Sequence, residues 1–348
     1  MVQPSAQRDE LRRVFLQDAG LGDLHPEPLR QDASFRRYFR LSVNQQQWLL
    51  MDAPPASENL DRWLHIAEHL RQLGLRAPQV FQADSANGFA LIEDFGNNTF
   101  TRLLDAGTDH ATLYRPAIDL LLYIHQHPDA RAIELPPYDF DALINEAVLL
   151  PDWFIPLVTG HPCPADTREE YLSAWHTIFS RLPGPAISLV LRDFHVDNLM
   201  QIPGFVPLEQ IGLLDFQDAV SGPLAYDVLS LLEDARRDLP QSLRTDMLQH
   251  YRDEMPLLDQ ENFFLWYDVL AAQRHCKVLG IFSRLALRDG KSQYLVHLKR
   301  VLDLLHQHLP APALTPLENW IGRRIQSFTL DAYPNLEATR IGLGLDAA

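Results

Sequence analysis

Three polar side chains stand where short apolar segments end, and their types suit one kind of chemistry. Asp193 follows the apolar run ISLVL, Asn198 comes five residues later, and Asp215 ends the run IGLL. Runs of this length predict short strands, so a tight loop and a hairpin would bring the three groups together. Together they would supply one carboxylate base and two hard oxygen ligands of the kind that Mg²⁺ prefers.

This set of groups favours phosphoryl transfer, which needs a carboxylate to orient and deprotonate the attacking hydroxyl and oxygen ligands for Mg²⁺ on the phosphates. Asp193 is the candidate base, and Asn198 and Asp215 are the candidate metal ligands. Aspartates also end strands and cap turns, and each residue taken alone favours that structural interpretation. Taken together, D-x-x-x-x-N after an apolar strand and a later D-F match the catalytic and metal loops of kinases in order and spacing.

The composition predicts a globular enzyme and excludes several other classes of protein. The chain has 348 residues, 46% of them hydrophobic, which is enough to fill the cores of two lobes. Its net charge of −16 opposes binding to nucleic acid or to an anionic membrane, since both require a basic surface. The N-terminus has no apolar signal core, and no apolar run approaches the roughly 20 residues that span a bilayer. We expect a cytoplasmic protein that acts on a small molecule without an obligate protein partner.

The cysteine and histidine patterns predict no metal centre beyond the magnesium site. Cys163 and Cys276 are the only cysteines, and they lie far apart without metal-type spacing, so ordinary thiols are expected. Four histidines that stand out also lack the spacing of a zinc site. They are His161, His176, His306 and His308.

The first third of the chain predicts a small β-rich lobe. A helix is expected near residues 7–18, and a second helical pattern runs over residues 60–74. Segments of alternating or apolar character predict strands that would complete a five-stranded antiparallel sheet ending near Gly96. These strand segments are residues 35–41, 47–53, 77–84 and 88–96.

After Thr99 the pattern becomes helical, which predicts a second, larger lobe. The exceptions are three short strand-like stretches at residues 187–191, 199–202 and 211–216, around the candidate catalytic groups. We therefore expect a nucleotide-binding lobe over residues 1–96 and a catalytic and substrate-binding lobe over residues 97–348. The expected helices include residues 113–128, 171–182, 223–236, 261–288 and 293–309.

The motifs resemble those of the aminoglycoside phosphotransferase and choline kinase superfamily, relatives of the protein kinases. Within it, the chain looks like the bacterial anomeric sugar kinases that phosphorylate N-acetylmuramate and N-acetylglucosamine in peptidoglycan recycling. The resemblance implies an α+β, protein-kinase-like bilobal fold with a small antiparallel β N-lobe and a mostly helical C-lobe. It also implies ATP and Mg²⁺ as cofactors and the C1 hydroxyl of a sugar as acceptor. The segments that carry it are DASFRRYFR, LLMDAPP, LIEDFG, PDWF, LRDFHVDNLM and LLDFQDAVSGPLAYDVLSLL.

The same resemblance implies roles for residues around the catalytic loop. It makes Asp193 the base and Asn198 and Asp215 the metal ligands, and it implies that Asp227 braces the loop from a helix. An aspartate near a helix N-terminus is also favoured by the helix dipole alone. Leu191 stands where kinases usually carry a histidine, which is a structural brace in the family rather than the base.

The expected nucleotide site departs from the family pattern at one position. Met51 and Asp52 stand where the phosphate-pairing lysine is usual, so other groups must neutralise the phosphates. The segment 32–40 lies where the glycine-rich loop belongs and offers candidates for phosphate contact, although it would also fit a solvated basic strand edge. These candidates are the Ser34 amide, Phe35, Arg36 and Arg37. Glu93 and Phe95 are expected at the interlobe hinge, where adenine would pair with the backbone.

Candidate contacts for the sugar come from the segment NEAVLLPDWF. The Glu146 carboxylate could accept hydrogen bonds from sugar hydroxyls and the Trp153 indole could stack on a pyranose, but both residues also fit ordinary structural roles. His195 and Asp197, within the catalytic loop, would either contact substrate or stabilise the loop.

Two other functions stay open at this point. One keeps the fold and changes the acceptor to an aminoglycoside, a choline-like alcohol or an amino-alcohol. The other is a nucleotide-binding regulator without catalysis, suggested by the missing lysine and by Leu191. The presence of Asp193, Asn198 and Asp215 argues against the regulator, because a pseudokinase commonly lacks one of these three groups.

Overall fold

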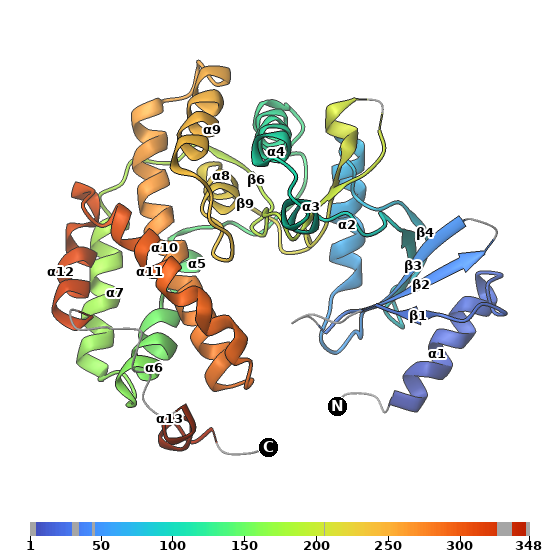
Figure 1. The fold of residues 1–348 in the computed structure, drawn as a ribbon, viewed down its shortest axis with the longest axis horizontal. Coiled ribbons are helices and arrows are strands. Elements are labelled where there is room, and N and C mark those ends of the chain that lie inside the picture. The colour runs from blue at the N-terminus through green and yellow to red at the C-terminus, as the bar shows by residue number, and fades with distance from the viewer. Residues whose placement is uncertain (1–4, 30–34, 44–45, 205, 326–335, 346–348) are drawn as a thin grey trace. The chain divides into compact units, whose positions relative to one another are not determined.

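The computed structural model describes residues 5–29, 35–43, 46–204, 206–325 and 336–345, which form two compact units (Figure 1). The first unit comprises residues 1–120, 127–133 and 193–219, and the second comprises residues 121–126, 134–192 and 220–348. Gly96 lies inside the first unit, between a strand and a helix. The compact units therefore differ from the lobes expected on either side of Gly96, and that functional division stays a prediction.

The first unit contains a five-stranded antiparallel sheet in the order β1-β2-β3-β5-β4. The alternating segments form strands as expected, and the hairpin register pairs Arg37 of β2 with Asp52 of β3. The two-residue strand β1, which carries no strand pattern of its own, was not foreseen. The strands are β1 (Glu27–Pro28), β2 (Arg37–Val43), β3 (Gln46–Asp52), β4 (Val80–Asp84) and β5 (Phe89–Glu93).

Helix α1 (Ser5–Asp18) packs against this sheet and covers part of its apolar face. Arg8 of α1 forms an ion pair with Asp52 at 2.7 Å, and its guanidinium lies 4.1 Å above the ring of Phe89. The buried carboxylate at the position of the usual lysine is thereby neutralised from within the fold. The apolar cluster at this contact is Phe15, Leu16, Phe39, Leu41, Leu50, Phe89 and Leu91.

A short hairpin in the first unit positions the candidate catalytic groups. Strands β7 (Leu199–Gln201) and β8 (Ile211–Leu213) pair antiparallel, with Leu199 opposite Leu213. A bridge from Thr99 to Met200 and a hydrogen bond from the Thr101 amide to the Val196 carbonyl join this region to the start of helix α3. Besides α1, the helices of this unit are α2 (Leu60–Gln72), α3 (Phe100–Asp105) and most of α4 (His110–Gln126).

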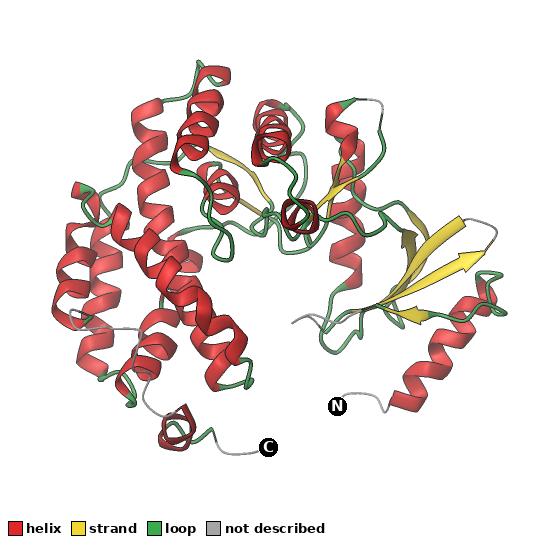
Figure 2. Ribbon diagram, viewed as in Figure 1, coloured by secondary structure: helices red, strands yellow, loops and turns green. Residues whose placement is uncertain are grey.

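The second unit is mostly helical (Figure 2) and is built around α10 (Gln260–Leu287). A Cβ on Gly280 would lie 2.3 Å from the backbone of Leu149, so glycine lets α10 approach the segment that follows α5. Strand β9 (Val220–Pro223), which pairs with β6 (Ile187–Val190), was not foreseen. The other helices are α5 (Phe140–Ala147), α6 (Ile155–Thr159), α7 (Ala165–Phe179), α8 (Ala225–Leu232), α9 (Gln241–Glu254), α11 (Leu298–His308), α12 (Thr315–Arg324) and α13 (Leu336–Gly342).

Two stretches of the second unit differ from the sequence-based expectation. The segment expected as one helix over residues 293–309 begins as a 3₁₀ turn, η3 (Ser292–His297), before α11. The stretch Phe140–Thr159 is long and apolar enough to cross a membrane by length and composition alone, although no such run was foreseen. This is weak evidence for a membrane span, because half of the apolar window is buried in the protein and core helices pass the same test.

A half-buried histidine at the end of α4 makes part of the stability dependent on pH. His125 Nδ1 lies 2.7 Å from the hydroxyl of Tyr251, and burial lowers the pKa of His125 from 6.5 to about 3. Between pH 6.5 and pH 3, His125 is therefore protonated in the unfolded chain but neutral in the folded chain. Its contribution to the free energy of unfolding is complete above pH 6.5 and is lost as the pH falls towards 3. We expect unfolding free energy to fall by about 2 kcal/mol between pH 7 and pH 5 from this group.

Urea denaturation at the two pH values tests this expectation. In His125→Asn the fall between pH 7 and pH 5 should be smaller than in the parent protein by about the same 2 kcal/mol. An unchanged pH dependence in the variant would contradict it.

Candidate active site

The structure brings Asp193, Asn198 and Asp215 together in the first unit. Asn198 Nδ2 donates to the Asp193 carbonyl at 2.9 Å, which closes the loop between them. The Leu214 amide donates to the Asn198 carbonyl at 3.0 Å, so the β7–β8 register places Asn198 beside the residue that precedes Asp215. The loop and the hairpin thus bring these three residues close along the backbone, and the joint role of their side chains stays a prediction.

The orientation of the two expected metal ligands fits a hard cation. Because Asn198 Nδ2 donates back to the loop, its amide oxygen is directed elsewhere. Within the part of the chain that the structure describes, Arg36 and Gln217 both contact Oδ1 of Asp215, at 2.6 and 3.0 Å, and these two contacts do not occupy Oδ2. An amide oxygen and a carboxylate oxygen are ligands that Mg²⁺ accepts while it keeps phosphate and water ligands.

Asp215 is held in a conformation that side chains seldom adopt. Its φ is 57°, and among the described residues other than glycine only Arg192 and Asp215 have positive φ. The ring of Phe216 lies 5.2 Å from that of Trp63 on α2, and Arg62 donates to the Ala219 carbonyl at 3.0 Å. These contacts from α2 hold the turn that presents the Asp215 carboxylate, as expected when backbone strain is stored at a functional site.

Arg36 lies directly beside the candidate metal ligand. It is 8% exposed, and besides Asp215 it contacts Gln217 Oε1 at 2.6 Å and Glu58 Oε2 at 3.4 Å. Burial lowers the pKa of the Arg36 guanidinium, but neighbouring Tyr38, Asp215 and Glu58 raise that pKa by more, so the group is charged. If Asp215 binds a cation, the buried Arg36 guanidinium beside it is suited to neutralise an anion that binds the same cation.

The other candidates for phosphate contact have different surroundings. Arg37 points to Asp52, with Nη2 3.3 Å from Oδ2, and is not in this contact set. Phe35 is 67% exposed, and Ser34 lies outside the described residues. Of the four, Arg36 is the residue that the structure places beside Asp215.

Asp227 braces the chain just before Asp193. It is fully buried on α8, and its carboxylate accepts from the amides of Leu191 at 2.6 Å and Arg192 at 2.9 Å. The two bonds hold Arg192 at a φ of 68°. These are the contacts that the expected bracing role requires. They give an acceptor to two backbone amides, which the apolar side chain of Leu191 could not do.

Removing the Asp227 carboxylate is expected to destabilise the fold. Asp227→Ala leaves two amides without their acceptor in a buried or part-buried place, so the free energy of unfolding should fall by about 2–4 kcal/mol. Urea denaturation measures this, and Asp246→Ala, at an exposed aspartate of α9, is the matched control with an expected change within about 0.5 kcal/mol. Equal stabilities of the two variants would argue against the brace.

Asp197 and His195 contribute to the loop itself. Thr101 Oγ1 of α3 donates a short hydrogen bond to Asp197 Oδ1, and the His195 carbonyl accepts from the Asn198 amide at 2.9 Å. His195 is buried, and its Nε2 lies 3.4 Å from Asn198 Nδ2. These contacts support a loop-stabilising role for both residues.

The expected hinge residues follow β5. Glu93 forms an ion pair with Arg76 at 2.6 Å, and its amide donates to the Gln79 carbonyl. Phe95 packs so closely on β8 that a Cβ on Gly212 would lie 2.6 Å from its ring. The side chains of Glu93 and Phe95 thus contact other parts of the fold. Adenine would therefore have to pair with backbone groups of this segment.

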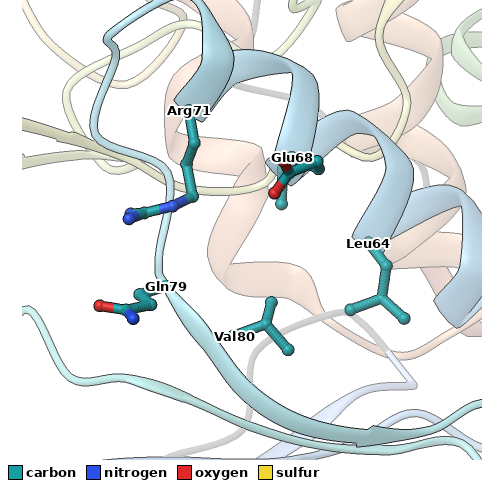
Figure 3. A pocket seen from close by; sticks show the side chains of 6 residues that line it. Leu64, Glu68, Arg71, Gln79 and Val80 are labelled. Carbon is teal, nitrogen blue, oxygen red and sulfur yellow. The ribbon is translucent and has the colours of Figure 1, made fainter.

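Two neighbouring pockets open near this segment. One, of about 360 Å³, lies between α2 and β4, where Glu68 and Arg71 project from the helix beside Gln79 (Figure 3). The other, of about 440 Å³, shares Arg71 and Gln79 and includes Glu93 in its wall. The walls of these two pockets contain none of the three catalytic candidates.

The expected sugar-binding residues lie in the second unit. Glu146 of α5 is held by Arg192, by Lys277 Nζ at 2.9 Å and by the hydroxyl of Tyr138. Trp153 is half-buried in a single π-helical turn, η1 (Leu150–Phe154), a distortion often found at functional sites. Sequence reasoning missed Arg192 and Lys277. The available signals were the position of Arg192 next to Asp193 and a lone lysine in the apolar pattern of α10.

His308, one of the histidines that lack zinc-type spacing in the sequence, lies in a buried polar cluster. His308 and His275 contact Glu233 Oε2 at 3.0 and 2.8 Å, and the three could hold a cation by distance. Tyr267 and Asp268 add hydrogen bonds to Glu233 and His308, which compensates the buried charges without a metal. The absence of a zinc role stays a prediction.

Comparison with known proteins identifies the family. The family model described as phosphotransferase enzyme family matches residues 25–264. The chain belongs to this phosphotransferase family. It is 33% identical to the N-acetylmuramate/N-acetylglucosamine kinase of Caulobacter vibrioides, over 92% of this chain and 98% of that protein. Relatives of the same name from two Pseudomonas species and Neisseria meningitidis are 34–35% identical.

Solved structures confirm the kinase-like fold of this phosphotransferase. The choline kinase of Streptococcus pneumoniae matches with a TM-score of 0.58 at 15% identity, over 86% of this chain and 99% of that one. An ADP-bound aminoglycoside phosphotransferase matches with a TM-score of 0.55 at 14% identity, over 88% and 99%. These structures confirm the predicted α+β fold. The family model and the relatives named kinases confirm the predicted superfamily and show a phosphotransferase acting on a small molecule rather than a non-catalytic regulator.

Proposed function

We propose that this phosphotransferase transfers the γ-phosphate of ATP to the C1 hydroxyl of N-acetylmuramate or N-acetylglucosamine, as part of peptidoglycan recycling in the cytoplasm. The observation that carries the proposal is the convergence of Asp193, Asn198 and Asp215 at one end of the β7–β8 hairpin. The acceptor follows from the names of relatives that align over most of the chain.

In this proposal each group around the hairpin has one role. Asp193 orients the acceptor hydroxyl and receives its proton, and Asn198 and Asp215 are the residues that would hold Mg²⁺ through their side-chain oxygens. Bound Mg²⁺ would supply positive charge to the β- and γ-phosphates and so ease the departure of ADP. Arg36 neutralises phosphate oxygens in place of the missing lysine, because its guanidinium already lies on Asp215.

The remaining contacts follow the expected lobes. ATP would bind the lobe of residues 1–96, with adenine paired to backbone between Glu93 and Phe95 and with Arg36, rather than Arg37, at the phosphates. The sugar would bind the lobe of residues 97–348. There Glu146 and Trp153 are the proposed contacts for its hydroxyls and its pyranose face.

The anomeric hydroxyl is a chemically reasonable acceptor for a carboxylate base. The ring oxygen withdraws electrons from C1, so this hydroxyl is more acidic than an ordinary alcohol and gives up its proton more readily. Direct in-line transfer then needs no phosphoenzyme. The bond from C1 oxygen to phosphorus forms as the bond between the γ-phosphorus and the bridging oxygen of ADP breaks, and the hydroxyl proton goes to Asp193.

Phosphorus NMR of the product tests the proposal, with MgATP and each amino sugar as substrates. We expect a phosphate on C1 and a loss of reducing sugar equal to the ADP formed. The matched control is the C1 methyl glycoside of N-acetylglucosamine, which keeps the C6 hydroxyl but has no free C1 hydroxyl and should give no product. Phosphate on C6, turnover of the methyl glycoside, or turnover only of an aminoglycoside or choline would contradict the anomeric assignment.

A further inference from the structure

Gln217 completes a triangle of hydrogen bonds with Arg36 and Asp215. Its Nε2 donates to Asp215 Oδ1 at 3.0 Å, and its Oε1 accepts from Arg36 Nη1 at 2.6 Å. The third side of the triangle is the bond from Arg36 Nη2 to the same Oδ1, at 2.6 Å. A longer contact of 3.4 Å joins Gln217 Nε2 to Asp218, which is exposed. The three residues of the triangle all belong to the first unit.

An amide is the side-chain group that this triangle requires. One atom of the group must accept from a cation and another must donate to a carboxylate, and glutamine carries both on one terminal group. A glutamate at position 217 would have no donor for Asp215, and a lysine would have no acceptor for Arg36. Protein kinases carry glycine after the D-F pair, where this chain has Gln217. The triangle therefore depends on a side chain that glycine cannot replace.

The backbone between Asp215 and Gln217 is held from α2. The ring of the intervening Phe216 lies 5.2 Å from that of Trp63, and the Ala219 amide donates to the Phe216 carbonyl at 2.9 Å. Asp215 has a φ of 57°, a conformation that persists only where the surroundings impose it. One short, anchored turn thus presents the Asp215 carboxylate and the Gln217 amide together.

The triangle also limits how the Arg36 guanidinium can turn. Its two Nη atoms bind different residues, and its Nε lies 3.4 Å from Glu58 Oε2, so contacts at three nitrogens fix the plane of the group. Without Gln217 the contact with Asp215 would remain, but the guanidinium could rotate about it. A planar group that is already oriented loses less entropy when it binds an anion.

We propose that Gln217 is a positioning residue for the nucleotide, because it holds the Arg36 guanidinium and the Asp215 carboxylate in one fixed arrangement for the phosphates of MgATP. This inference rests on the proposed phosphoryl transfer at Asp215 and deepens it, but it does not depend on which sugar is the acceptor. Gln217 acts through the two residues that it joins. Its loss should therefore weaken binding of the nucleotide and leave binding of the acceptor unchanged.

Calorimetric titration with a nonhydrolysable ATP analogue and Mg²⁺ tests this role without turnover. In Gln217→Met, which keeps a side chain of similar length, the affinity should fall about tenfold, the lower end of the usual cost of losing a group that orients a metal ligand. In the Arg36→Ala background the same substitution should change the affinity less than about threefold, because the triangle is already open.

Gln72→Met is the matched control for the titration. Gln72 of α2 is exposed, and its amide also donates to a carboxylate, that of Glu68, at 2.9 Å. The substitution therefore removes the same kind of hydrogen bond from the same unit of the protein. The affinity for the ATP analogue should be unchanged in this variant.

Two further measurements distinguish positioning from general damage to the fold. Steady-state kinetics of Gln217→Met should show a KM for ATP about tenfold higher and a KM for the amino sugar within about threefold of the parent value. NMR of the protein without nucleotide needs no change at position 217. In Arg36→Ala the side-chain amide resonance of Gln217 should shift, whereas that of Gln72 should not.

The possible failures of this proposal and of the kinase function can be told apart. Unchanged nucleotide affinity in Gln217→Met, a tenfold loss that persists in Arg36→Ala, equal rises in both KM values, or an unmoved Gln217 resonance would overturn the role of Gln217 and leave the kinase function intact. Failure of the parent protein to bind the ATP analogue with Mg²⁺ would overturn both. Binding of the analogue without phosphorylation of either amino sugar would overturn only the proposed acceptor.

Discussion

The Asp193→Asn variant is expected to lose about 10³-fold in kcat while it binds MgATP as the parent enzyme does. Asparagine keeps the shape of the side chain and its ability to orient a hydroxyl, but it cannot accept the proton, and a general base contributes roughly 10²- to 10⁴-fold. The backbone carbonyl of residue 193, which accepts from Asn198, is unchanged by the substitution. The candidate metal ligand Asn198 therefore keeps the hydrogen bond that holds it in the loop.

The measurements are steady-state kinetics with a saturating amino sugar and calorimetric titration with a nonhydrolysable ATP analogue. Asp197→Asn is the matched control within the same loop, because its Oδ1 still accepts from Thr101 and only the negative charge is removed. We expect it to lose less than about tenfold. Comparable losses of kcat in the two variants would show that activity depends on the total negative charge of the loop, and that Asp193 is not the base.

The parts of the fold and site predicted from sequence are those with local signals. Alternating or apolar runs bounded by turns gave the sheet strands and the two strands that flank the D-x-x-x-x-N loop, and side chains near a hairpin must meet. Asn198 and Asp215 are such a case, because the pairing of Leu199 with Leu213 follows from the hairpin itself. Strands too short or too polar for a pattern, such as β1 and β9, were missed.

Contacts between distant segments gave no such signal. The resemblance placed Met51 and Asp52 where a lysine is usual, but Arg8, the ion-pair partner of Asp52, belongs to α1, and the ion pair exists only because that helix packs on the sheet. The association of Glu146 with Lys277, 131 residues away, likewise depends on how α5 and α10 pack. Sequence alone suggested sugar hydroxyls as the partners of Glu146, whereas the structure shows that its first partners are cations.

The ion pair between Arg8 and Asp52 affects which cation is available for the phosphates of the nucleotide. Where kinases of this superfamily usually carry a lysine, this chain has a carboxylate that is neutralised by Arg8 and contacted by Arg37. The side chain at that position therefore cannot serve the phosphates. Arg36, the residue just before β2, instead contacts the candidate metal ligand Asp215 at 2.6 Å, so the task of the lysine would pass to Arg36.

Replacing Arg36 with alanine is accordingly expected to lower kcat/KM for ATP about 10²- to 10³-fold, the usual cost of losing one pre-positioned charged donor to a transferring group. With Asp215 and Glu58 left unneutralised at 2.6 and 3.4 Å from the lost guanidinium, the triphosphate would also meet two extra negative charges. Arg36→Lys should recover about tenfold, because it restores the charge without the planar fork.

Steady-state kinetics with varied ATP measure these losses, and thermal unfolding shows whether each variant is folded. Arg37→Ala is the matched comparison: that arginine is adjacent in sequence but contacts Asp52, so its removal should cost less than about tenfold. If Arg37→Ala were the more damaging change, the phosphates would lie on the other face of β2. If both variants stayed within about threefold of the parent enzyme, neither arginine would replace the lysine, and another cation would have to be sought.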